Sequence, residues 1–362
     1  MNQVDIALLR LQQQQLASPV YERAEQVVGW LGALQAQDYG MAKWAVAQRT
    51  KSLTNADLDR AFDRGEILRT HVLRPTWHFV TPADIRWLQT LTAEHNRQAS
   101  ALYFRRLEVD ERQAGRSRDL LVQALQGGKQ LTRPELGQVL QAGGLDTHNL
   151  LRLTYLVIWA ELDGLLCSGS RRGKQFTYAL LDERAPQAGQ LDREQALAEL
   201  TRRYFISRGP ATAEDFMWWS GLNAGQVNAG LALAGADLAQ AEVDGKSYWF
   251  AAGLPDAAKI SPAVYLLSIL DEYIIAYRDR KAALDGKEPV SSIPRGAILF
   301  NPTLVIDGRV AGVWKRVFNK GRVLLSIIPF GELSLAEEQA LEPVLERYGE
   351  FCGQPVVLRK EN

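Results

Sequence analysis

Gly-Ala-Leu-Gln-Ala-Gln-Asp-Tyr-Gly, residues 32–40, is the stretch around which the chain is organised. Residues 27–34 carry apolar side chains at helical spacing, so a helix over residues 22–35 is expected to face a core. Gln35 and Gln37 are two residues apart, and on a continuing helix their side chains would point about 200° from each other. Two amides with one shared function therefore require the helix to end here, because residues two apart share a side only in extended backbone. The alternative is that both are solvated glutamines at a helix terminus.

The totals exclude several classes of protein. A chain of 362 residues suggests two to four domains. Its 42 basic and 42 acidic residues balance, so any binding of nucleic acid must come from local basic patches. Cys167 and Cys352 are too few for a disulfide framework or a Cys-rich zinc site, and the four histidines have no metal-ligand spacing. With no Walker loop, nucleophile elbow or dinucleotide fingerprint, neither a metal nor a cofactor is expected.

Nothing in the sequence indicates a membrane protein. The first residues lack the basic-then-apolar pattern of a signal peptide, and no apolar run approaches the roughly 20 residues of a membrane span. A soluble, cytoplasmic and nucleoid-associated protein is the expectation, and a monomer is the default.

One outline recurs along the chain. In residues 1–95, helices lead to two β-leaning runs, 67–73 and 76–80, which is the outline of a winged helix. The outline recurs within residues 96–185, after a basic linker, and again within residues 190–258. Each repeat contains a Thr-x-x-Glu or Thr-x-x-Asp capping arrangement that opens a helix. Three tandem winged helix-turn-helix units are therefore expected, the first carrying the two glutamines.

Residues 259–362 show a different sequence pattern. Short apolar runs alternate with turns at 307–308 and 319–321, which favours an antiparallel meander or small barrel, followed by a helix over 335–348. The expected fold class is α+β, with three winged-helix units and a C-terminal antiparallel β-rich region.

Two hairpins are basic enough to contact DNA. Arg171, Arg172 and Lys174 lie at the tip expected for the second wing, where they would contact phosphates. Lys315 and Arg316 beside a tryptophan form a second basic hairpin, which could enter a groove as a wedge. For the first hairpin, the alternative is a solvated tip.

The first unit gathers arginine and histidine on its paired strands. Strand alternation puts Arg69 and His71 on one side, while Arg74 and His78 complete the run. Such residues would form a polar wall beside the Gln35 and Gln37 turn and contact phosphates or bases. The alternative is that the histidines make buried hydrogen bonds.

A last group of charged residues lies near the C-terminus. Asp271, Glu272 and Asp279 could form a catalytic carboxylate set, but Arg278 and Arg280 beside them favour structural ion pairs.

Several segments together resemble the winged-helix DNA glycosylase family typified by AlkZ and YcaQ. They are Leu-Gln-Ala-Gln-Asp at 34–38, residues 69–78, Gly-Pro-Ala-Thr at 209–212 with 215–222, residues 271–273 with 277–280, and Gly-Val-Trp-Lys-Arg at 312–316. The resemblance implies a concave, positively lined DNA cleft and excision of alkylated purines, including the unhooking of interstrand crosslinks. The family's catalytic Gln-x-Gln motif falls on Gln35 and Gln37. The YcaQ group has aspartate at the second position, so Gln37 places the chain on the AlkZ side.

The resemblance and the basic hairpins together give the expected DNA contacts. These are Arg69, His71, Arg74, His78, Arg171, Arg172, Lys174, Arg278, Lys315 and Arg316.

The chemistry of two glutamines limits the substrate. An N7-alkylated guanine is cationic, so its departure needs little protonation, and an amide oxygen can orient water against C1′. The sequence therefore predicts a monofunctional DNA glycosylase for alkylated bases in duplex DNA, with no lysine adjoining the site to form a Schiff base. Asp38 is the alternative general base, with the glutamines orienting it. A sequence-specific transcriptional regulator and a non-enzymatic scaffold are the alternative functions.

Overall fold

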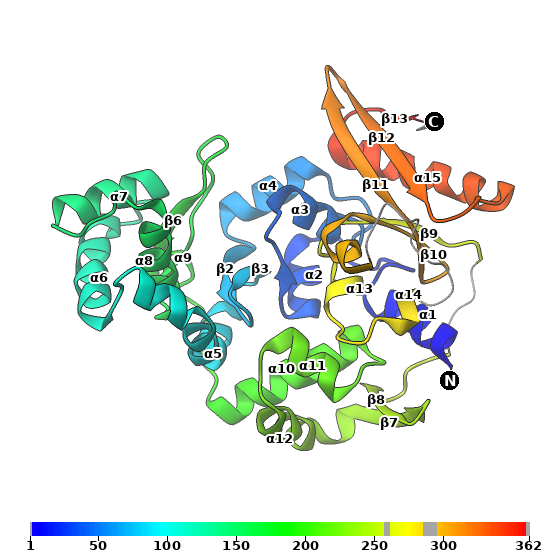
Figure 1. The fold of residues 1–362 in the computed structure, drawn as a ribbon, viewed down its shortest axis with the longest axis horizontal. Coiled ribbons are helices and arrows are strands. Elements are labelled where there is room, and N and C mark those ends of the chain that lie inside the picture. Colours follow the sequence, from blue (N-terminus) through cyan, green and yellow to red (C-terminus); the bar gives the residue numbers. More distant parts are fainter. Residues whose placement is uncertain (1, 257–260, 285–294, 360–362) are drawn as a thin grey trace.

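The computed structural model describes residues 2–256, 261–284 and 295–359 (Figure 1). One order of elements occurs three times: a helix, a short strand, two helices and a hairpin. The first repeat follows the leading helix α1 (Gln3–Gln13). It consists of α2 (Ala24–Leu31), β1 (Leu34–Gln35), α3 (Tyr39–Ala47), α4 (Asn55–Arg64), β2 (Leu68–Val72) and β3 (Thr76–Val80). Its three strands form an antiparallel sheet in the order β1-β3-β2.

The second and third repeats follow the long helix α5 (Ile85–Arg106). The second consists of α6 (Glu111–Leu125), β4 (Leu131–Thr132), α7 (Arg133–Ala142), α8 (Leu150–Leu162), β5 (Leu166–Ser168) and β6 (Thr177–Leu180), and it ends in α9 (Leu181–Arg184). The third consists of α10 (Arg193–Arg208), α11 (Ala213–Ser220), α12 (Ala224–Ala234), the 3-10 turn η1 (Gly235–Asp237), β7 (Leu238–Val243) and β8 (Lys246–Ala251). In the third repeat a bridge between Ala211 and Trp249 takes the place of the short strand.

The local signals in the sequence explain where these helices start. Thr54, Thr132 and Thr212 each accept a hydrogen bond from the backbone N–H three residues on, and each capping box is closed by the expected carboxylate. The helix expected over residues 22–35 is wrong at its C-terminal end. It stops at Leu31 because Gly32 adopts φ 73°, a conformation that ends a helix readily in glycine. The backbone then becomes extended at Gln35, as the spacing of the two glutamines requires.

The C-terminal part is a five-stranded sheet with helices around it. The sheet has the order β13-β12-β11-β10-β9, from β9 (Val264–Leu267), β10 (Thr303–Ile306), β11 (Arg309–Asn319), β12 (Arg322–Pro329) and β13 (Val356–Arg359). The helices are α13 (Glu272–Ile275), α14 (Lys281–Leu284), the 3-10 helix η2 (Arg295–Phe300) and α15 (Leu335–Cys352). Strands β9 to β12 form the expected meander. The antiparallel prediction is wrong for β13, which pairs parallel to β12 because α15 carries the chain back to the same end, and the sheet is open rather than a barrel.

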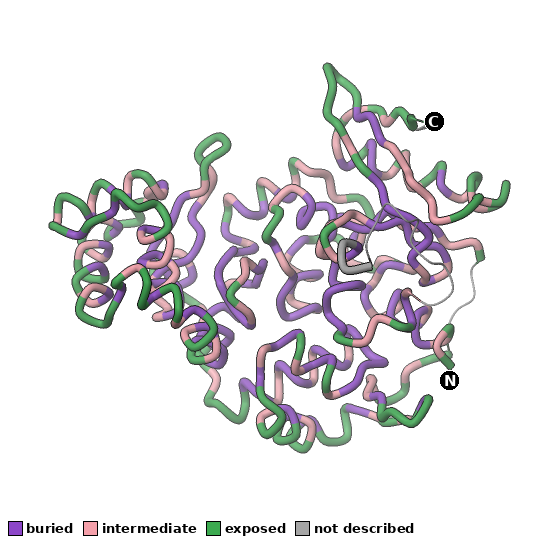
Figure 2. The backbone as a smooth tube through the Cα atoms, in the orientation of Figure 1, coloured by how far each residue is buried: buried purple, intermediate pink, exposed green. Residues whose placement is uncertain are grey.

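The cores join segments that are distant in sequence. Trp44 on α3 donates its indole N–H to the carbonyl of Leu266, at 2.6 Å, and Trp314 on β11 donates to Leu267, at 2.8 Å, so the first repeat and the C-terminal sheet share one core. A second core joins the β1-β3-β2 sheet to α10 and α11, and a third lies within the second repeat. The buried segments run through the centre of the molecule in Figure 2. The second repeat lies at one end of the molecule and the C-terminal sheet at the other, with α10–α12 below the centre (Figure 1).

Candidate active site

Gln37 lies on a short addition that the other repeats lack, and Gln35 directly precedes this addition as the last residue of β1. In the second repeat Thr132 is both the last residue of β4 and the N-cap of α7, and in the third repeat the N-cap Thr212 directly follows the bridge residue Ala211. In the first repeat the residues at 36 and 37 are interposed between Gln35 and the N-cap Asp38. We call residues 35–38 the glutamine turn. This local addition indicates a function beyond packing, since the fold forms twice without it.

The glutamine turn presents its amides at the end of the sheet. Gln37 is exposed, and its Oε1 accepts the backbone N–H of Trp77 at 3.3 Å. Gln35 is half-buried, and its side-chain amide has no hydrogen-bond partner within the described residues. Asp38 is exposed, and its Oδ1 accepts the N–H of Met41 at 3.0 Å, so one of its oxygens caps α3. Two neutral amides and one capping carboxylate are therefore the groups that the turn offers for chemistry.

A buried ion pair supports the turn from behind. The backbone N–H of Gln35 donates to Glu272 Oε1 at 2.9 Å. Glu272 Oε2 accepts from Arg208 Nη2 at 2.7 Å and from Trp219 Nε1 at 2.9 Å. Arg208 also donates to the carbonyls of Leu31 and Ala33, at 2.7 and 2.8 Å. Glu272 and Arg208 are 1% and 0% exposed, so this pair fixes the exit of α2 and the position of Gln35.

Arg69 holds the other side of the turn. Its Nε donates to the carbonyl of Ala36 at 3.0 Å, and its Nη2 lies 3.5 Å from the carbonyl oxygen of Gln37. The guanidinium packs over the Trp77 ring, 4.2 Å from the centroid, and burial lowers the pKa of Arg69 to about 10. Direct contact of Arg69 with DNA is therefore not supported, because its donors face the glutamine turn and its side chain is covered.

The two histidines of the first unit lie on opposite faces of its sheet. His71 is buried against Trp77, and its Nδ1 lies 2.6 Å from Glu161 Oε2 on α8. His78 is fully buried and is the cross-strand partner of Gln35, so the two side chains lie on the same face. The buried-hydrogen-bond alternative therefore fits both histidines better than the predicted contact with DNA. His78 Nδ1 lies 2.9 Å from the carbonyl oxygen of Thr76, an acceptor, so the neutral ring carries its proton on Nδ1 and leaves Nε2 as an acceptor.

The burial of His78 makes stability depend on pH. Burial lowers the pKa of His78 from 6.5 to about 3, so between these values the unfolded chain binds a proton that the folded chain excludes. The free energy of unfolding is therefore expected to fall as pH decreases from 6.5 towards 3, by at most about 1.4 kcal/mol per pH unit from this group. Urea unfolding of wild type and His78→Gln at pH 7, 6 and 5 measures this, and the variant should show the weaker dependence. Equal slopes would contradict the assignment.

The basic tip of the second unit is turned towards the first unit. Arg171 pairs with Asp59 on α4 at 3.2 Å, and its backbone N–H donates to Asp63. Arg172 pairs with Glu135 at 2.6 Å. Only Lys174 of the three is exposed without an ion pair in the described part of the chain. The solvated-tip alternative is therefore incomplete too, because Arg171 and the carboxylates on α4 form an interface between the two repeats.

The C-terminal hairpin places its basic residues differently. Lys315 is exposed on β11. The Arg316 Nη1 donates to the Tyr348 hydroxyl at 2.6 Å. A β-carbon at Gly40 would lie 3.5 Å from both Arg316 Nη2 and Asp38 Oδ1, so this guanidinium lies beside the start of α3. The hairpin thus reaches the glutamine turn, although the two are nearly 280 residues apart in sequence.

The carboxylates near the C-terminus are structural, but their partners differ from the expected ones. Asp271 pairs with Arg49 at 2.7 Å and Glu272 with Arg208, while Asp279 pairs with Lys246. Arg278 is exposed, and only its backbone is engaged within the described residues: its N–H donates to Asp215 and its carbonyl accepts from Arg280. Pairing with Arg278 and Arg280 was the wrong prediction because sequence proximity does not reveal which buried arginines face these acids. Arg208 was not predicted, because in sequence it looks like the neighbouring Arg202 and Arg203 of the same helix.

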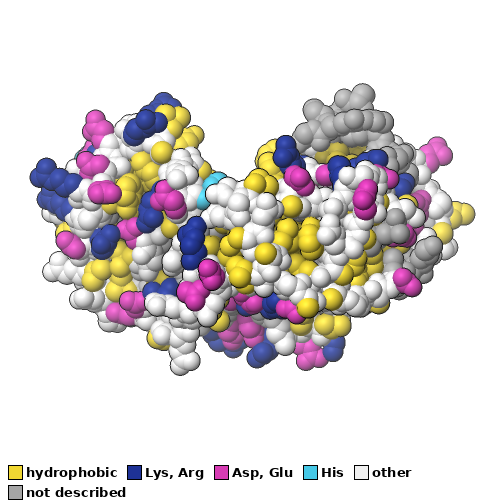
Figure 3. Space-filling view, turned by 90° about the horizontal axis from the view of Figure 1, so that it is seen from below, with side chains coloured by type: hydrophobic (Ala, Val, Ile, Leu, Met, Phe, Trp, Pro, Cys, Tyr) yellow, Lys and Arg dark blue, Asp and Glu magenta, His cyan; other side chains and the backbone are white. Residues whose placement is uncertain are grey.

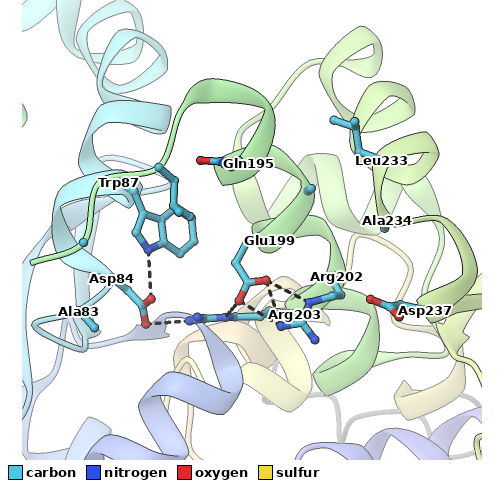
Figure 4. Close-up of a pocket in the computed structure, with 13 residues that line it drawn as sticks. Ala83, Asp84, Trp87, Gln195, Glu199, Arg202, Arg203, Leu233, Ala234 and Asp237 are labelled. Carbon is cyan, nitrogen blue, oxygen red and sulfur yellow. Dashed lines mark hydrogen bonds and ion pairs between the residues drawn. The ribbon is translucent and has the colours of Figure 1, made fainter.

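The pocket in Figure 4 lies between α5, α10 and α12, and no residue of the glutamine turn lines it. Its central charges pair with one another: Arg203 bonds Asp84 and Glu199, and Glu199 also holds Arg202. Asp84 accepts the indole N–H of Trp87 at 3.1 Å as well. This network joins helices and leaves no free group for chemistry at its centre.

No helix among the described residues is both long and apolar enough to cross a membrane. No three His, Cys, Asp or Glu residues within residues 2–256, 261–284 and 295–359 gather closely enough to hold a metal ion.

Comparison with known proteins places this geometry in a family. A family model of AlkZ-like DNA glycosylases matches residues 28–351. The chain is 26% identical over 348 residues to a Streptomyces sahachiroi protein described as an interstrand DNA cross-link repair glycosylase, covering 92% of each sequence. The solved structure of the Streptomyces sahachiroi DNA glycosylase AlkZ matches with a TM-score of 0.82 at 23% identity over 100% of both chains, which shows a shared fold. The chain belongs to the AlkZ-like DNA glycosylase family and is an enzyme that acts on N-glycosyl bonds of DNA.

Proposed function

We propose that this chain is a monofunctional glycosylase that hydrolyses the N-glycosidic bond of N7-alkylated purines in duplex DNA, with Gln35 and Gln37 positioning the water. The observation that carries the proposal is the glutamine turn, an addition to a repeated fold that two separate sets of contacts hold rigid. Rigid support of this kind suits residues that must be positioned accurately for catalysis.

Neutral amides are sufficient to assist the hydrolysis of an N7-alkylated purine. Water adds to C1′, the bond from C1′ to N9 breaks, and its electron pair passes to the purine and cancels the charge of the alkylated ring. The proton that water loses passes to solvent, and the Gln37 amide oxygen, or that of Gln35, accepts a hydrogen bond from the water and orients it. An unmodified nucleoside lacks the positive charge, so its base is a much poorer leaving group. Lys43 on α3 is held by Asp59 at 2.7 Å, which favours hydrolysis by water over a Schiff base.

The three repeats suit DNA binding as three winged helices. Each has the helix, strand, helix, helix and hairpin order of that motif, with the strand reduced to a bridge in the third, and Figure 3 shows the molecule hollowed between the second repeat and the opposite end. We propose that duplex DNA occupies this hollow, with the chain acting as a monomer and the glutamine turn facing the lesion. Lys174 and Arg278 are exposed and remain proposed phosphate contacts.

The β11–β12 hairpin is proposed as a wedge. Val317 and Phe318 lie near Lys315 on this hairpin, and they are 59% and 56% exposed to solvent. Apolar side chains next to basic ones are the combination that inserts into a minor groove. Lys315→Gln is expected to weaken DNA binding and to reduce the slope of log Kd against log salt by about 1, because one phosphate contact is lost. Fluorescence anisotropy at several salt concentrations measures this, and an unchanged slope would exclude Lys315 as a contact.

The function is tested by incubating wild type with a duplex that carries one N7-methylguanine. We expect release of free 7-methylguanine and strand cleavage only after alkali, because no lyase step follows hydrolysis. A duplex with an interstrand crosslink through guanine N7 then tests unhooking, which requires an open site rather than a closed pocket. A regulator without catalysis would instead protect one DNA sequence in footprinting and release no base.

A further inference from the structure

Three side chains meet where α11 packs on the β2–β3 turn. Trp218 on α11 is 42% exposed, and its indole N–H donates to the carbonyl of Ile275 at 3.0 Å. The guanidinium carbon of Arg74 lies 5.7 Å from the centroid of the indole, and that of Arg280 lies 5.4 Å from it. The C-terminal end of α11 packs tightly against the β2–β3 turn, since a β-carbon at Gly221 would lie 2.8 Å from the carbonyl oxygen of Leu73. We call Arg74, Arg280 and Trp218 the arginine corner.

The arginine corner adjoins the glutamine turn. Gln37 Oε1 accepts the N–H of Trp77, which closely follows Arg74 in the chain, and His78, the cross-strand partner of Gln35, lies 2.9 Å through its Nδ1 from the carbonyl oxygen of Thr76. The β2–β3 turn that carries Arg74 therefore lies at the same end of the sheet as the glutamine turn.

The two arginines lack counter-ions. Burial lowers the pKa of Arg74, and burial, followed by a smaller effect of the charge of Arg74, lowers the pKa of Arg280 against the opposing effect of Asp215. Neither pairs with a carboxylate in the described part of the chain, and buried Arg74 Nε and Arg280 Nη2 have no hydrogen-bond partner there. Arg280 is held only by carbonyls, those of Ile274 and Arg278.

The acids around the corner are already occupied. Glu272 binds Arg208 and Trp219, Asp279 binds Lys246, and Asp215 binds Arg10 together with three backbone N–H groups. Two half-buried like charges without a carboxylate partner are unfavourable unless an anion joins them. Guanidinium groups bind phosphate oxygens with charge-assisted, bidentate hydrogen bonds.

We propose that Arg74 and Arg280, ordered by Trp218, bind one DNA phosphate that flanks the damaged nucleotide. This rests on the proposed glycosylase function, and it adds a positioning site: the corner fixes the backbone of the damaged strand so that C1′ faces the glutamine turn. Arg280 and Trp218 are then positioning residues for the reaction, in addition to Arg74.

The test uses duplexes with a tetrahydrofuran abasic-site analogue, so that binding is measured without base release. One phosphate at a time on the strand with the analogue is replaced by an uncharged methylphosphonate, and Kd is measured by fluorescence anisotropy for wild type, Arg74→Gln and Arg280→Gln. At one of the two flanking phosphates wild type is expected to lose about tenfold in affinity, as for one charge-assisted contact. Each variant should bind the unmodified duplex about tenfold more weakly, lose little more at that phosphate, and show a salt slope smaller by about 1.

Controls separate this contact from general effects of charge and folding. Arg202→Gln removes the same charge at the pocket of Figure 4 and should retain the full methylphosphonate loss. Arg280→Lys keeps the charge and should retain the salt slope. Arg74 makes no side-chain hydrogen bond among the described residues, so Arg74→Gln should keep the melting temperature of wild type. If the loss of affinity caused by the methylphosphonate and the loss caused by the substitution simply add at every phosphate position, the proposal is overturned.

The outcome is independent of the substrate assignment. If N7-methylguanine is not released but the coupling is found, the phosphate site stands and the proposed function fails. If base is released normally and the coupling is absent, the phosphate site fails alone.

Discussion

A Glu272→Ala variant is expected to lose about 3–5 kcal/mol of its free energy of unfolding, because removing one partner leaves a buried charge uncompensated. Glu272 accepts hydrogen bonds from Arg208, Trp219 and the backbone of Gln35, and the contacts with Arg208 and Trp219 are buried. Without Glu272, the guanidinium of Arg208, which is 0% exposed, loses its carboxylate partner. Urea unfolding at pH 7, followed by tryptophan fluorescence, measures the difference.

The matched control for this variant is Arg202→Gln, which breaks a partly exposed pair on α10. Ion pairs at the surface contribute little to stability, so the control should lose no more than about 1 kcal/mol of its free energy of unfolding. Since Glu272 also fixes Gln35, the destabilised variant should lose base-release activity at a temperature where it is still folded. A loss of stability as small as that of the control would show that the pair does not support the glutamine turn.

Alanine at Gln37 is expected to lower the single-turnover rate of base release at least about 100-fold, the lower end for a group that orients a reacting water. Gln37 is exposed and holds only the Trp77 N–H, so its removal should change neither the melting temperature nor the affinity for DNA appreciably. Saturating enzyme on an N7-methylguanine duplex isolates this step from binding. The double variant Gln35→Ala, Gln37→Ala should lose little beyond the larger single effect if the amides act as one unit.

Asp38→Asn separates the two interpretations of the turn. Asparagine caps a helix as well as aspartate does, so the contact with the Met41 N–H survives and the stability of α3 should be retained. If the glutamines orient the water, this variant keeps most of its activity. If it loses more activity than Gln37→Ala, the general base is Asp38 and the glutamines are its orienters.

The sequence predicts the local elements well and the surroundings of the side chains poorly. The spacing of Gln35 and Gln37 requires extended backbone, and the threonine capping boxes start helices where expected, because both signals act within a few residues. The pairing of β1 with β3 was not predicted, since its partner lies more than 40 residues away and the strand has two residues.

The same limit explains the predicted DNA contacts. Alternation correctly puts Arg69 and His71 on one face, but it does not say that Trp77 and α8 cover that face. Arg171 was expected at a free tip, yet its partner Asp59 precedes it by 112 residues and only the packing of two repeats brings them together. Buried arginines such as Arg208 give hardly any signal in sequence, because nothing local distinguishes them from solvated ones.

A site built of neutral amides is expected to act on a base that already carries positive charge. This is tested most directly by measuring, with wild type at saturating concentration, base release from two duplexes that differ in one nucleotide, N7-methylguanine in one and the neutral purine hypoxanthine in the other. We expect release of 7-methylguanine and no detectable release of hypoxanthine. Comparable release of both bases, or release of hypoxanthine alone, would contradict it, because the enzyme would then need an acid that the glutamine turn does not provide.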